Sequence, residues 1–83
     1  MEQLSLGGRD LPVVRLTAKG ARWQRTGHPW IYRDDLAGEA KLAAGELVAV
    51  LSPPGRFLGQ AFYSAASRIA LRFVTYGEVA VDG

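Results

Sequence analysis

The run Leu47–Leu51 constrains the fold of this chain more than any other segment. Its five residues, LVAVL, are all apolar and lie between Gly45 and Pro53. A short, continuous apolar run between turn-forming residues is typical of a β-strand that is buried on both faces. The chain has 83 residues and no cysteine, so an apolar core without disulfides must hold one small domain together.

Other segments have the composition of strands. Residues 13–17, residues 30–32 and Phe57–Tyr63 are rich in β-branched or aromatic side chains. In residues 68–76, apolar side chains alternate with arginines. We therefore expect Ile69, Leu71 and Phe73 to face the core and Arg68 and Arg72 to point outward. The chain is predicted to be mainly β with a short helix, in a small, partly closed barrel of about five to six strands.

Residues 18–26 are predicted to form the helix. Thr17 is a suitable N-cap, and Gly27 is a suitable residue just after the last turn. Gly20 weakens the helix, so tertiary packing must hold it in place. Trp23 is expected to point into the core.

The basic residues are unevenly distributed. The net charge is only +2, but residues 13–33 and residues 52–76 contain eight cations and no acid. On the predicted helix, Lys19, Arg22 and Arg25 recur every three residues, which favours one cationic face. Eight of the ten cations are arginine, whose planar guanidinium suits phosphate contacts and base stacking.

Catalytic and metal-binding patterns are absent from the sequence. There is no glycine-rich phosphate loop with its lysine, no G-x-S-x-G and no H-E-x-x-H. The pair Asp34-Asp35 with the single His28 could form an acid–base site, but adjacent aspartates after a strand are typical of a turn. We expect no catalytic residue, no cofactor site and no metal site in this chain.

Nucleic-acid binding fits the charge pattern better, because cations and aromatic side chains are interleaved around residues 19–33. The candidate RNA-binding residues are Lys19, Arg22, Arg25, His28, Trp30, Arg33, Arg68 and Arg72. The alternatives are a solvated helix face, a core position for Trp30, and ion pairs of Arg68 and Arg72 with nearby acids. A barrel for protein–protein contact would instead expose an apolar patch.

A set of motifs runs through most of the chain. They are Leu16-x-x-x-Gly20, Gly27-His28-Pro29-Trp30-Ile31-Tyr32, Gly45-Glu46-Leu47-Val48-x-Val50, Phe57-Leu58-Gly59 and Tyr63-x-x-x-Ser67-x-Ile69-x-Leu71-Arg72. Together they resemble the N-terminal PUA domain (pseudouridine synthase and archaeosine transglycosylase domain) of the large-subunit ribosomal RNA cytosine-5 methyltransferase I family. The sequence departs from that pattern at Gln60 and at Ala65-Ala66, where glycine or a basic residue and an Asn-Pro pair are usual.

The resemblance implies a pseudo-barrel that binds structured RNA, expected to be ribosomal RNA. It also implies a following methyltransferase domain that uses S-adenosylmethionine and would lie beyond Gly83. We accordingly expect a loose leader over residues 1–12, a PUA-like domain over residues 13–76 and the start of a linker over residues 77–83. Neither a signal peptide nor a run of about 18 apolar residues is present, which favours a cytoplasmic location.

Overall fold

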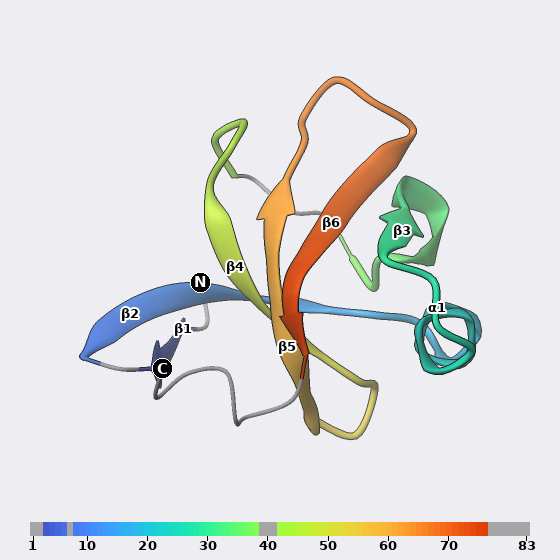
Figure 1. The fold of residues 1–83 in the computed structure, drawn as a ribbon, viewed down its shortest axis with the longest axis horizontal. Helices are drawn as coiled ribbons and strands as arrows, with labels where there is room; N and C mark the ends of the chain where they lie inside the picture. Colours follow the sequence, from blue (N-terminus) through green and yellow to red (C-terminus); the bar gives the residue numbers. More distant parts are fainter. Residues whose placement is uncertain (1–2, 7, 39–41, 77–83) are drawn as a thin grey trace.

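The computed structural model describes residues 3–6, 8–38 and 42–76, and it consists mainly of β-strands (Figure 1). The elements in chain order are β1 (Gln3–Leu6), β2 (Arg9–Arg15), α1 (Ala18–Arg25), β3 (Trp30–Tyr32), the 3-10 turn η1 (Arg33–Asp35), β4 (Leu47–Leu51), β5 (Phe57–Tyr63) and β6 (Ile69–Tyr76). The six strands form one sheet in the order β1-β2-β4-β5-β6-β3. The mainly β fold with one short helix, predicted from the sequence, is confirmed. Within the described residues, no helix has the length and apolar character needed to cross a bilayer.

The core lies around the middle strands of the sheet. In β4, Val48, Ala49 and Val50 are completely buried, which confirms a strand covered on both faces. In β6, Leu71 and Phe73 are buried while Arg72 is exposed, as the alternation predicts, although Ala70 is buried as well.

The expectation of a loose leader over residues 1–12 is wrong for the part that the structure describes. β1 and β2 form an antiparallel hairpin in which Leu4 pairs with Leu11 and Leu6 with Arg9. Leu11 is buried, and Gly8 has the positive φ (+80°) that a tight hairpin turn requires. The predicted linker, residues 77–83, lies outside the described residues.

One pair of strands is parallel, and as a result the segments that follow these two strands lie close together. β2 runs parallel to β4, with Arg15 opposite Leu51, whereas every other pairing among the named strands is antiparallel. The backbone N–H of Leu16 donates to the carbonyl of Leu51 (2.9 Å). Since α1 follows β2 and the β4–β5 turn follows β4, the helix and the turn lie at the same end of the sheet.

The β4–β5 turn is built around Ser52. The carbonyl of Ser52 accepts from Gly55 N–H (2.9 Å), and its hydroxyl accepts from Arg56 N–H (3.1 Å). The turn thus spans residues 52–55. Gly55 has a positive φ (+101°), and Arg56 is left exposed at the start of β5.

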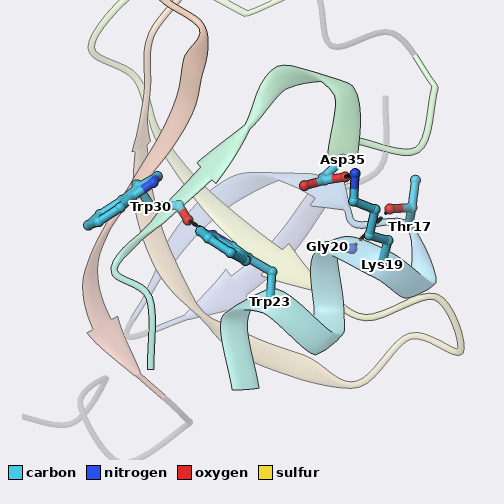
Figure 2. Close-up of polar contacts among 6 residues, drawn as sticks. All are labelled: Thr17, Lys19, Gly20, Trp23, Trp30 and Asp35. Atoms are coloured by element: carbon cyan, nitrogen blue, oxygen red, sulfur yellow. Dashed lines mark hydrogen bonds and ion pairs between the residues drawn. The ribbon is translucent and has the colours of Figure 1, made fainter. Parts of the chain in front are cut away.

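Helix α1 begins and ends as predicted. Thr17 Oγ1 accepts a hydrogen bond from Gly20 N–H (3.0 Å), and Gly27 follows the last turn with φ +99°. Gly20 allows the helix to approach η1 closely, because a Cβ at this position would lie 2.9 Å from both the Cβ and the carbonyl oxygen of Asp35. Figure 2 shows Gly20 beside Asp35 and the Thr17 cap.

We expect Gly20→Ala to lower the free energy of unfolding by up to about 2 kcal/mol. Alanine improves helix propensity by about 1 kcal/mol, but overpacking against the backbone of η1 costs about 1 to 3 kcal/mol and should win. Urea unfolding of both proteins would measure the difference. A more stable variant would show that α1 does not need the close approach to Asp35.

Candidate nucleic-acid interface

Aromatic side chains fasten α1 to β3. The Trp23 indole N–H donates to the carbonyl of Trp30 (3.0 Å), as Figure 2 shows, and Trp23 packs against the core as expected. The His28 ring stacks on Trp23 at a centroid distance of 3.5 Å and meets Trp30 edge-on at 5.7 Å. Tyr32 lies 5.8 Å from Trp23. One face of the His28 ring is therefore covered, and the aromatic cluster sets the position of the helix.

Arg33 is engaged in holding the β5–β6 connection. Its guanidinium donates to the carbonyls of Ser64 (2.6 Å) and Ser67 and to the Tyr63 hydroxyl (3.1 Å). The guanidinium carbon also lies 5.7 Å from the centre of the Tyr63 ring. Because charge-assisted hydrogen bonds to backbone carbonyls are strong, Arg33 stabilises the β5–β6 connection.

Two surface pockets contain most of the predicted RNA-binding cations. The first, which we call the mixed pocket, lies beside η1 and has a volume of about 470 Å³. It is lined by Lys19, Tyr32, Arg33, Asp34, Asp35 and Arg68. Lys19 Nζ is 3.8 Å from Asp35 Oδ1, and the Asp35 carboxylate is nearly buried. Because acids and bases alternate here, the mixed pocket has little excess positive charge.

The second pocket, which we call the arginine pocket, lies between α1 and the β4–β5 turn. Its volume is about 620 Å³, and its lining residues are Ala18, Ala21, Arg22, Gln24, Arg25, Ser52, Pro53, Pro54, Arg56, Phe57 and Leu58. Among the residues that the structure describes, three arginines and no acid contribute to this lining. Their guanidinium groups are exposed and make no hydrogen bond or ion pair with other residues in the described part of the chain.

The helix does not present its three cations on one surface. Lys19 faces the mixed pocket, while Arg22 and Arg25 line the arginine pocket. At 3.6 residues per turn, each step of three residues moves about 60° around the helix, so Lys19 and Arg25 lie about 120° apart.

The remaining predicted residues lie in different surroundings. Arg68 lines the mixed pocket, and Arg72 is exposed on β6 opposite Trp30 of β3. Trp30 is half-buried. Arg56, which the sequence analysis did not select as a site residue, joins the arginine pocket because the parallel β2–β4 pairing brings its turn beside α1.

The structure gives little support to an acid–base site formed by His28 with Asp34 and Asp35. Asp34 and Asp35 line the mixed pocket, but His28 is not among its lining residues. Within residues 3–6, 8–38 and 42–76, no group of three His, Cys, Asp or Glu side chains lies close enough to hold a metal ion.

The fold and the arginine pocket together define a small β-domain with a cationic surface of the kind that holds phosphate groups. The sequence family of PUA-like domains matches residues 14–76, and the chain belongs to this family. Domains of the family typically bind RNA. The match concerns the PUA-like domain and includes no methyltransferase. No curated protein sequence matches the chain.

Proposed function

We propose that this PUA-like domain binds structured RNA by holding phosphate groups at the arginine pocket. One observation carries the proposal: Arg22, Arg25 and Arg56 surround a single pocket, and no acid among the described residues lines it. Planar guanidinium groups donate two hydrogen bonds at once to a phosphate, and each contact releases counterions from the RNA. The Arg15 guanidinium lies close to Gly55 at the same turn.

The other candidate residues have supporting roles in this proposal. Lys19, Arg68 and Arg72 extend the contact to flanking phosphates, with Lys19 and Arg68 weakened by their acidic neighbours. Arg33, His28 and Trp30 keep α1 and the β5–β6 connection in place. Replacing these three residues should therefore lower the free energy of unfolding more than it changes the RNA affinity of the folded domain.

We further propose that the RNA is ribosomal and that the domain presents it to a methyltransferase domain that follows in the chain. The support is the resemblance of the motifs from Leu16 to Arg72 to the cytosine-5 methyltransferase I family. The lining of the two pockets does not fit S-adenosylmethionine, since neither contains a glycine-rich loop between a strand and a helix. The cofactor would belong to the following domain, and no role described here depends on it.

The dissociation constant for a ribosomal RNA stem-loop, measured between about 50 and 200 mM salt, tests RNA binding. Each phosphate contact makes the slope of the log association constant (the reciprocal of the dissociation constant) against log salt more negative by about 0.7 to 0.9. Contacts from the three arginines predict a slope of about −2 or steeper. An affinity that does not change with salt, or no measurable affinity at the lowest salt, would contradict the proposal.

A second candidate function is contact with another protein, and it rests on the outer face of β5 and β6. Phe62 and Val74 are each 47% exposed on these neighbouring strands. Exposed apolar side chains that lie together are typical of protein-interaction surfaces. If this were the main function, RNA affinity would be absent at every salt concentration. Phe62→Ser/Val74→Ser would then abolish binding to the protein partner.

A further inference from the structure

The lining of the arginine pocket includes apolar side chains that a phosphate site does not need. Apart from the three arginines, its lining is mainly apolar. It includes Ala21, Phe57 and Leu58, together with the exposed Pro53 and Pro54. A site for backbone phosphates needs cations and hydrogen-bond donors, and apolar side chains add nothing to such contacts. The apolar part of the lining therefore requires another explanation.

The size and chemistry of the pocket suit a nucleobase. A volume of about 620 Å³ falls within the range of roughly 300 to 1,000 Å³ that small-molecule pockets occupy. Unstacked bases in RNA loops and bulges bind by stacking on aromatic side chains and on arginine planes. Phe57 is half-buried in the lining, so part of its ring remains available for such stacking.

We propose that the arginine pocket takes up one unpaired nucleotide, with the base against Phe57 and the adjoining phosphates on Arg22, Arg25 and Arg56. This inference rests on the proposed RNA-binding function and specifies its substrate class. Bases inside a continuous duplex are stacked on their neighbours and cannot reach the apolar part of the lining. The domain should thus prefer RNA with a bulge or loop over fully paired RNA.

The test compares a fully paired RNA duplex with the same duplex carrying one additional, bulged nucleotide in one strand. Wild-type protein should bind the bulged RNA about tenfold more tightly, which corresponds to about 1.4 kcal/mol, within the range for stacking one base. Phe57→Ala should bind both RNAs with the same affinity as wild type shows for the duplex. Phe62→Ala is the matched control, because Phe62 lies on the same strand but does not line the pocket.

A second variant removes the pocket without removing an aromatic ring. Ala21→Leu places a larger side chain in the pocket from a helical position that tolerates leucine, and Ala66→Leu, in the exposed β5–β6 connection, is its control. Ala21→Leu should bind the bulged RNA no more tightly than the duplex, whereas Ala66→Leu should keep the wild-type preference for the bulged RNA.

The outcomes separate the two proposals. Equal wild-type affinity for both RNAs, or a bulge preference that survives in Phe57→Ala and Ala21→Leu, would overturn the nucleotide pocket but leave RNA binding in place. Failure of wild-type protein to bind either RNA would overturn RNA binding, and the nucleotide pocket with it.

Discussion

Replacing Arg22 and Arg25 by glutamate is expected to weaken RNA binding by at least about 100-fold at 100 mM salt. Each arginine in direct contact with a phosphate contributes about 1.5 kcal/mol or more, and the introduced carboxylates also repel the RNA backbone. Two such losses amount to about 3 kcal/mol, which corresponds to more than 100-fold in the dissociation constant. Fluorescence anisotropy with a labelled stem-loop would measure it.

The matched control is Lys19→Glu/Arg68→Glu, which changes the net charge equally but at the mixed pocket. Lys19 and Arg68 already have Asp34 and Asp35 as neighbours, so this variant should lose far less affinity. Both variants replace exposed side chains, and circular dichroism should show the wild-type fold in each. Equal losses in the two variants would mean that only total charge matters and that the arginine pocket is not the binding surface.

Leu71→Ala is expected to reduce the free energy of unfolding by about 2 to 5 kcal/mol. Leu71 is completely buried in β6, between Tyr63 of β5 and Ile31 of β3, and its truncation leaves a cavity in the middle of the core. A domain of this size has a total stability of about 4 to 12 kcal/mol, so the variant should lose a large part of its stability and unfold at a lower temperature than the wild type.

Thermal and urea unfolding followed by circular dichroism would measure the loss. Val74→Ala provides the control, because Val74 is half exposed on the same strand and should lose less than about 1 kcal/mol. Similar losses in the two variants would contradict the position of the core described here.

Local sequence patterns were sufficient to predict most of the individual elements. The Thr17 cap, Gly27 and the apolar run Leu47–Leu51 each act over a few residues, and the structure has the helix and the strand where they indicate. The hairpin of β1 and β2 was missed because Asp10 and Pro12 are unfavourable in strands, although the Gly7-Gly8 pair is a hairpin signal.

The candidate site was harder to predict because it depends on contacts between distant segments. The parallel pairing of β2 with β4 brings Arg56 to Arg22 and Arg25, and no local pattern indicates that pairing. Helical spacing separates Lys19 from Arg25, but it could not show that Asp35 would lie 3.8 Å from the Lys19 ammonium. Similarly, the hydrogen bonds of Arg33 go to carbonyls 31 and 34 residues away.

An NMR titration of the labelled domain with a bulged ribosomal RNA stem-loop tests the central claim most directly. We expect the largest amide shift changes in α1, from Ala21 to Arg25, and in Ser52 and residues 55–58, with smaller changes on the outer face of β5 and β6. The perturbations should disappear in Arg22→Glu/Arg25→Glu. Changes centred on Phe62 and Val74, or no changes at low salt, would contradict RNA binding at the arginine pocket.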